Sequence, residues 1–134
     1  MGETMKGHGV GKGSAQGEAV VTSQMISNDY IGAVDGVYRE KGHELDGKTV
    51  GGKILVFPVG KGSSVVAHSL LGAKMMGGAP VAMVFDRPTE IQVQSTILAQ
   101  IPAVYGSEKS AIKAIKSGER IRVDAEQGTV EILE

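Results

Sequence analysis

The sequence predicts an α/β fold, a layered β/β/α domain built around a short parallel β-α-β-α-β unit with additional strands. Buried strands are indicated at residues 53–59 and 81–85 with a helical pattern between them, and a second helical pattern leads to a short strand at 101–105. Strand-helix-strand connections within one sheet are almost always right-handed and parallel. A length of 134 residues is typical of one domain, so we expect residues 1–134 to form a single domain.

The first half of the chain and its end add strands to this unit. Residues 18–26 are rich in β-branched side chains and predict extended structure. Residues 1–12 form either a loose, disordered arm or a turn into the first strand. Residues 119–133 alternate apolar and polar side chains on both sides of a turn that contains Gly128, which is typical of a hairpin.

Three helices are expected. The first has Val66, Leu70, Ala73 and either Met75 or Met76 on its apolar side and is ended by a glycine pair at 77–78. The second, weaker pattern covers residues 89–100. The third is predicted to be capped by Ser107, to bury Ile112 and Ile115, and to end before Gly118.

The composition excludes several classes of function. Hydrophobic residues make up 41% of the chain, charged residues 22%, and the net charge is -1, which is typical of a folded soluble protein and not of a basic nucleic-acid binder. Cysteine is absent, so this chain can supply no thiolate ligand for zinc or an iron–sulfur cluster. The apolar runs are far shorter than the ~20 residues that span a bilayer, and the first residues lack a signal-peptide pattern. We expect a cytoplasmic protein that binds neither nucleic acid nor membranes.

The turn at residues 60–64, Gly-Lys-Gly-Ser-Ser, is the first candidate for a functional site. Ligands of open α/β sheets gather at the carboxyl ends of the parallel strands, where such turns lie. Backbone N–H groups beside a helix N-terminus favour an anion there. A serine at this point is also the commonest helix cap, so a purely structural turn is an alternative. Val65 stands where a dinucleotide-binding motif needs its third glycine, which argues against nucleotide binding.

The histidines do not indicate a metal site. His8, His43 and His68 have no metal-ligand spacing, and His68 is predicted to lie in the middle of the first helix among apolar neighbours. The aspartates of the first half lie in probable turns, which explains them without acid–base catalysis. We therefore expect no metal ligands in this chain.

A series of short motifs resembles one family. These motifs are Gly17-Glu18-Ala19, Gly32-x-x-Asp35, the run Val-Phe-Pro-x-Gly-x-Gly-Ser-Ser at 56–64, and Gly78-Ala79-Pro80. Their order resembles the small, swivel-domain subunit of the aconitase X family, from about residue 11 to 105 and beyond. The resemblance implies a swivelling β/β/α domain that forms a heterodimer with a large subunit, which carries a 4Fe-4S type cluster and most of the active site.

The resemblance also implies an activity. Family members with a separate small subunit are hydro-lyases that dehydrate (R)-5-phosphomevalonate to trans-anhydromevalonate 5-phosphate, in a modified mevalonate route to isoprenoids. In the aconitase-like mechanism the proton acceptor is a serine oxygen, which corresponds to Ser63, and Gly62, Ser64 and Lys61 are then expected to bind the substrate. Ordinary aconitases have an arginine where Val65 stands, so a tricarboxylic substrate is not expected.

Other functions stay open. Bacterial relatives act as cis-3-hydroxy-L-proline dehydratases. The segment from residue 101 to Gly128 also resembles the phosphohistidine swivel domain of phosphoenolpyruvate-using enzymes, but that family needs a histidine in the turn after the first crossover strand, and His68 lies one helical turn later. A regulatory or structural swivel module would keep the fold and leave Ser63 as a helix cap.

Overall fold

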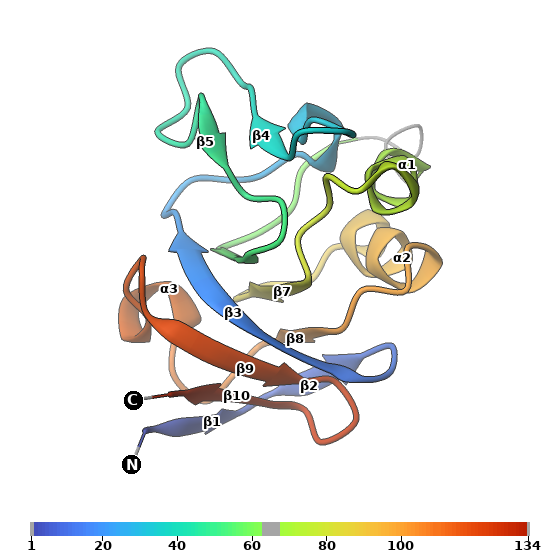
Figure 1. The fold of residues 1–134 in the computed structure, drawn as a ribbon. Coiled ribbons are helices and arrows are strands. Elements are labelled where there is room, and N and C mark those ends of the chain that lie inside the picture. Colours follow the sequence, from blue (N-terminus) through green and yellow to red (C-terminus); the bar gives the residue numbers. More distant parts are fainter. Residues whose placement is uncertain (1, 63–67, 134) are drawn as a thin grey trace.

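An eight-stranded mixed sheet organises the chain, in the order β1-β10-β9-β3-β6-β7-β8-β2 (Figure 1). The computed structural model describes residues 2–62 and 68–133. The strands of the sheet are β1 (Thr4–Lys6), β2 (His8–Val10), β3 (Ser14–Val21), β6 (Ile54–Phe57), β7 (Ala82–Phe85), β8 (Ala103–Tyr105), β9 (Arg120–Asp124) and β10 (Thr129–Ile132). A second, two-stranded sheet joins β4 (Val37–Tyr38) to β5 (Lys48–Thr49), and the helices are η1 (Asn28–Tyr30), α1 (Ser69–Met76), α2 (Glu90–Leu98) and α3 (Ala111–Ala114).

The predicted parallel unit is present. Strand β6 pairs in parallel with β7, β7 with β8, and β3 joins β6 in parallel on the other side. Helix α1 connects β6 to β7, and α2 connects β7 to β8. In this register Phe57 lies beside Phe85, and Phe85 beside Tyr105, so aromatic rings stack across the carboxyl ends of the three strands.

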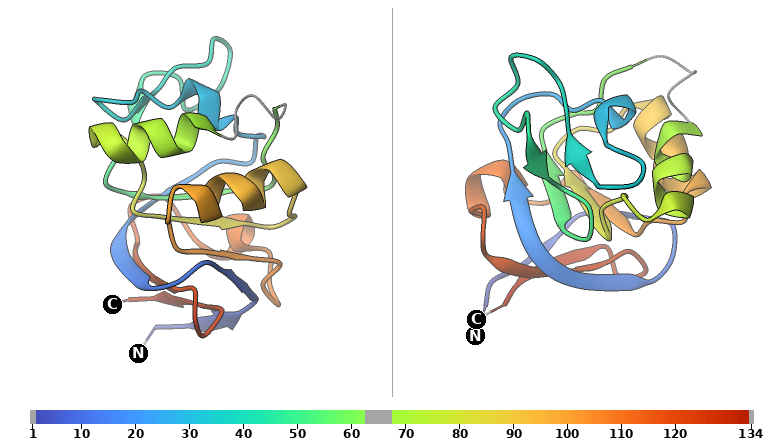
Figure 2. Two further views of the ribbon diagram at one scale, coloured as in Figure 1. Left: turned by 90° about the vertical axis from the view of Figure 1, so that its right-hand side faces the viewer. Right: turned by 45° about the horizontal axis from the view of Figure 1, so that its top comes forward.

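The two faces of the parallel strands bury two separate cores, which confirms the β/β/α layering. Alternate residues such as Leu55 and Met83 face α1, α2 and the long segment between β3 and β6. Their neighbours Ile54 and Val84 face α3 and the β9–β10 hairpin. Figure 2 shows α1 and α2 together on one flank of the molecule and α3 on the other. Burying each such side chain stabilises the fold by about 1.5–3 kcal/mol.

The N-terminal segment closes the sheet. Strands β1 and β2 are two halves of one segment bent at Gly7, and they pair with β10 and β8, the strands at the two ends of the remaining order. The Gly7 amide donates to the Gly128 carbonyl at 2.7 Å, and a Cβ at Gly7 would lie 2.7 Å from the Tyr105 carbonyl oxygen. Residues 4–10 therefore form strands and not a loose arm.

Glycines allow backbone to pack directly on backbone where the segment between β3 and β6 meets the loop after α1. A Cβ at Gly36 would lie 2.6 Å from the Cα of Gly51, and one at Gly51 would lie 2.7 Å from the Gly78 carbonyl oxygen. Such distances exclude any side chain without a shift of the main chain. Part of the high glycine content is therefore explained by this contact, in addition to tight turns.

The start and the packing of α1 differ from the sequence prediction. The helix begins at Ser69 and ends at Gly77, which adopts a left-handed conformation, as the glycine pair predicts. His68 is exposed at the N-cap position, so its predicted place in the middle of the helix is wrong. Leu70 and Ala73 are buried as expected, but Met75 and Met76 are 78% and 59% exposed, since they lie at the solvent-facing end of the helix. Val66 lies outside the described residues.

The cap of α3 also differs from the prediction. The helix begins after Ser110, whose hydroxyl donates to the Asp86 carboxylate, and the amide of Ala111 donates to the same carboxylate at 2.9 Å. Ser107 donates instead to the carbonyl of Lys109. The predicted Ser107 cap is therefore wrong, because a carboxylate from the end of β7 satisfies the first turn of the helix.

The described helices are short. The longest, α2, has nine residues, and Thr89 caps it by accepting from the Gln92 amide. Over residues 2–62 and 68–133, none has the length and apolar character needed to cross a bilayer.

Candidate functional site

The predicted turn follows the carboxyl end of β6, as the sequence indicates. Within it, Gly60, Lys61 and Gly62 are described, whereas Ser63 and Ser64 lie outside the described residues. Gly62 is exposed and has a φ of 130°, a backbone conformation that residues with a side chain rarely adopt. This glycine is therefore required by the path of the chain.

Backbone hydrogen bonds fasten the entry to the turn. The Lys61 amide donates to the Ile26 carbonyl at 2.8 Å, and the Ile26 amide donates to the Val59 carbonyl at 3.2 Å. Ile26 and Gly60 thus form a parallel bridge that extends the β6 edge. Because Ser27 caps η1 directly after this bridge, η1 and the turn are held side by side.

The Lys61 ammonium is paired with the carboxylate of Glu40. Lys61 Nζ contacts Glu40 Oε2, while Glu40 Oε1 accepts a 2.7 Å hydrogen bond from the Tyr38 hydroxyl. The same hydroxyl accepts from the Ser27 amide at 3.0 Å. The turn, the loop after β4 and the cap of η1 are thereby joined in one polar network, and the charge of Lys61 is partly compensated.

This network shifts the pKa values of its acids. Burial raises the pKa of Tyr38 far above its ordinary value, and the hydrogen bond to Glu40 raises it further. Desolvation also raises the pKa of Glu40, but the hydrogen bonds from Lys61 and Tyr38 outweigh it and hold that pKa below its ordinary value. Around neutral pH Tyr38 is therefore a neutral phenol and Glu40 is a carboxylate.

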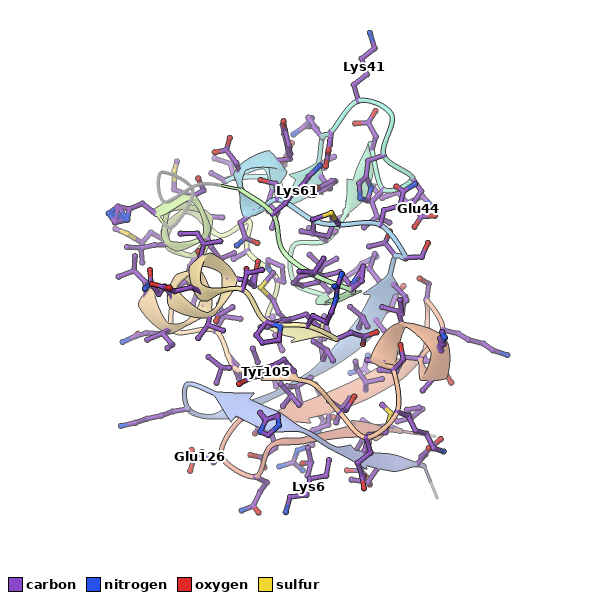
Figure 3. The ribbon with its side chains drawn as sticks, turned by 180° about the vertical axis from the view of Figure 1, so that it is seen from behind. Lys6, Lys41, Glu44, Lys61, Tyr105 and Glu126 are labelled. Atoms are coloured by element: carbon purple, nitrogen blue, oxygen red, sulfur yellow. The ribbon has the colours of Figure 1, made fainter. Side chains whose placement is uncertain are left out.

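A shallow hollow of about 430 Å³ opens beside the ion pair. Figure 3 shows Lys61 and Lys41 toward one end of the molecule, and Lys6 and Glu126 toward the other. The His43 ring is fixed by Met25, whose carbonyl lies 3.0 Å from Nε2, and by the Leu45 amide, which donates to Nδ1. The hollow is lined by two lysines and by the Glu40 carboxylate, so it carries charges of both signs. The residues that line the hollow are Ser23, Gln24, Met25, Glu40, Lys41, Gly42, His43 and Lys61.

The other histidines lie apart from the turn's polar network. The His8 ring lies tilted against Tyr105 with ring centroids 5.2 Å apart, and His68 lies exposed at the start of α1. In the part of the chain that the structure describes, no group of three or more His, Asp or Glu side chains could hold a metal ion.

The sequence analysis did not assign a role to Glu40 or Tyr38. Tyr38 ends β4 and Glu40 follows it, and they are linked to the turn only through the tertiary fold, since Glu40 stands 21 residues before its partner Lys61. No local motif marks them. A buried tyrosine followed two residues later by a glutamate carries no signal for this contact, which only the structure reveals.

The layered β/β/α arrangement, with a glycine-serine turn at the carboxyl end of its first crossover strand, defines the architecture of a swivel domain. The chain belongs to the aconitase X swivel domain family, whose model matches residues 4–132.

Named relatives agree with this assignment. The chain is 36% identical over 132 residues to the phosphomevalonate dehydratase small subunit of Methanosarcina acetivorans, with 96% of this chain and 90% of that protein covered. It is 38% identical over 126 residues to the protein of the same name from Archaeoglobus fulgidus, with 92% and 93% covered. The crystal structure of Thermococcus kodakaraensis aconitase X in its holo-form superimposes with a TM-score of 0.92 at 34% identity, and the match covers 99% of this chain and 100% of that one.

Proposed function

We propose that this chain is the small subunit of a hydro-lyase that dehydrates (R)-5-phosphomevalonate to trans-anhydromevalonate 5-phosphate. The observation that carries the proposal is the run Gly62-Ser63-Ser64 at the carboxyl end of β6, in a family whose relatives are named phosphomevalonate dehydratase small subunits. The active site is shared with a large subunit, because one small domain with a shallow hollow encloses too little of a substrate.

In this proposal Ser63 is the proton acceptor. Its oxygen removes a proton from C2 of phosphomevalonate, the carbon next to the carboxylate, and the electron pair forms the C2–C3 double bond. The C3–O bond breaks and the hydroxyl departs as hydroxide with the bonding pair, and this hydroxide and the proton taken up by Ser63 together make up the water that is lost. A serine needs backbone N–H groups or similar donors to be ionised at neutral pH, and since the Lys61 amide donates to Ile26, the proposal assigns this role to the other amides of the turn.

Lys61, Gly62 and Ser64 bind the anionic substrate beside this base. Lys61 contributes a cation that Glu40 orients, and the neighbouring hollow is lined by polar groups that suit a phosphate or carboxylate. Gly62 leaves space for close approach of the substrate to the main chain, since it carries no side chain.

The 4Fe-4S type cluster is placed on the large subunit. This chain contains no cysteine, and its described residues offer no metal-binding group, so they do not fit an iron–sulfur cluster. When bound, the cluster supplies the Lewis acid that helps the hydroxyl to depart.

The test is a Ser63→Ala variant, co-expressed with the large subunit of the same organism. As a lost base, the substitution lowers kcat by roughly 10²-fold or more while the complex still assembles. As a lost helix cap, it costs only about 0.5–2 kcal/mol of stability and leaves kcat nearly unchanged. Ser64→Ala is the matched control, because it deletes the same atom one residue away and is expected to affect kcat less.

The substrate is tested with the unsubstituted complex. Turnover of phosphomevalonate supports the proposal. Turnover of cis-3-hydroxy-L-proline without turnover of phosphomevalonate would keep the reaction class and overturn the substrate. A fully active Ser63→Ala complex with its cluster absorbance intact would reject the serine base.

A further inference from the structure

We infer that Asn28 and Asp29 of η1, together with Gln92 of α2, are positioning residues for the serine turn. The inference rests on the proposed function, because it assigns these residues to the placement of Ser63. They contact the chain at Gly60, where it enters the turn, and at Ser69, where α1 begins.

At the entry, Gly60 lies against the side-chain amide of Gln92. A Cβ added to Gly60 would lie 2.3 Å from Gln92 Oε1, so the main chain approaches this amide as closely as a glycine allows. Asn28 Nδ2 donates to the same oxygen at 3.2 Å. Gln92 therefore packs against Gly60, and Asn28 of η1 holds the Gln92 amide through this hydrogen bond.

At the exit, Asp29 reaches the start of α1. The Ser69 hydroxyl donates to Asp29 Oδ1 at 2.9 Å. Because Asn28 and Asp29 are consecutive in η1, this short helix contacts the start of α1 directly and reaches Gly60 through Gln92. A shift of η1 is therefore expected to disturb both contacts.

The amide pair is unusual for a contact that serves stability alone. Asn28 and Gln92 are 3% and 1% exposed, and Asn28 Oδ1 is buried without a hydrogen-bond partner among the described residues. Burying an unpaired amide oxygen costs free energy that an apolar side chain of similar size avoids. The hydrogen bond from Asn28 fixes the direction of the Gln92 amide beside Gly60, which an apolar contact would not do.

The test measures kcat and KM of complexes that carry Asn28→Asp, Gln92→Leu or Asp29→Ala. Asn28→Asp keeps the shape but removes the donor to Gln92, and Asp29→Ala removes the acceptor for Ser69. We expect kcat to fall by roughly 10-fold or more with KM changed less than about 2-fold, because a small displacement of a reacting group is costly. Asp29→Asn keeps Oδ1 as an acceptor and is expected to restore most of the lost kcat.

Two matched controls separate positioning from stability. Ser95→Ala deletes a buried hydroxyl from the same helix as Gln92, where it donates to the Ile91 carbonyl. Asp35→Ala deletes an exposed carboxylate that pairs with Arg39 and lies outside the network. Both are expected to leave kcat unchanged. Variants and controls are compared at matched melting temperatures. If the controls then lose as much kcat as the variants do, the positioning role is overturned.

Hydrogen exchange gives a readout that does not depend on activity. The amides of Ile26 and Lys61, which bond to Val59 and Ile26, are expected to exchange faster in the intact complexes with Asn28→Asp or Gln92→Leu than in the Ser95→Ala complex. Unchanged exchange would reject the positioning role. If exchange rises but the Ser63→Ala complex stays fully active, the positioning role of these residues is supported and the proposal that Ser63 is the base is rejected.

Discussion

Glu40 and Lys61 form an ion pair that connects the loop after β4 to the turn after β6. Tyr38, which is fully buried, donates to the other oxygen of the same carboxylate. The carboxylate therefore has one neutral and one cationic partner. Since Lys61 stands next to Gly62, the state of Glu40 affects both the stability of this end of the molecule and the charge available at the turn.

The first prediction concerns stability and pH. The pKa of Glu40 is lowered in the fold from its ordinary value of 4.5, so its contribution is present above about pH 4.5 and is lost as the pH falls below it. Glu40→Gln is expected to lower the melting temperature at pH 7, and the difference from the original chain should shrink toward pH 3. Thermal melts across this pH range measure it, and a difference that stays constant would contradict the role of Glu40.

The second prediction concerns the charge at the turn. Lys61→Met is expected to raise KM for an anionic substrate by at most ~5-fold with little effect on kcat, because Glu40 already compensates the cation. Glu40→Gln should lower KM, since it releases the Lys61 charge. The control is Lys53→Met, which removes a lysine that pairs with Glu18 instead. Steady-state kinetics of the complex test this prediction. An unchanged KM in both the Lys61→Met and the Glu40→Gln complexes would remove Lys61 from substrate binding.

The third prediction concerns the packing of glycine on glycine. Gly51→Ala places a Cβ 2.7 Å from the Gly78 carbonyl oxygen and is expected to destabilise the fold by about 1–3 kcal/mol. Gly72→Ala is the control, because a Cβ there meets nothing within 4 Å in the middle of α1. That substitution should stabilise the fold by about 0.5–1 kcal/mol. Urea denaturation would show opposite shifts, and equal shifts would argue against the close contact.

The fourth prediction separates the two candidate caps of α3. Asp86→Ala removes the acceptor for the Ser110 hydroxyl and the Ala111 amide and is expected to cost about 1–2 kcal/mol. Ser107→Ala should cost less than about 0.5 kcal/mol, since that hydroxyl bonds only a nearby carbonyl in its own loop. Chemical denaturation of both variants tests this, and a larger loss for Ser107→Ala would restore the cap indicated by the sequence.

Several regular elements of the fold were predictable because their sequence signals are local. The apolar runs of β6 and β7, the left-handed glycine that ends α1 and the alternation of the β9–β10 hairpin each lie within a short stretch of sequence. The cap of α3 was not predictable in the same way. Asp86 stands 24 residues before Ser110, so no local pattern connects this carboxylate with the first turn of the helix.

The site was predictable only in part. The motif at 56–64 located the turn, and the structure places Gly60, Lys61 and Gly62 at the carboxyl end of β6. The groups that contact those residues come from η1, the loop after β4 and α2. Their partners are fixed by tertiary packing, and neither hydrophobic periodicity nor spacing carries that information. Ser63 stays a prediction from the motif.

The bend at Gly7 has a consequence for how this domain meets other chains. An exposed strand edge is a template to which a foreign strand can add. Here the ends of the eight-stranded order are β1 and β2, each three residues long and both part of the segment that closes the sheet, and β4 and β5 have two residues each. Among the described strands, an incoming chain thus finds only very short backbone templates. What the described surface offers a partner is therefore mainly side chains and turns, and little strand edge.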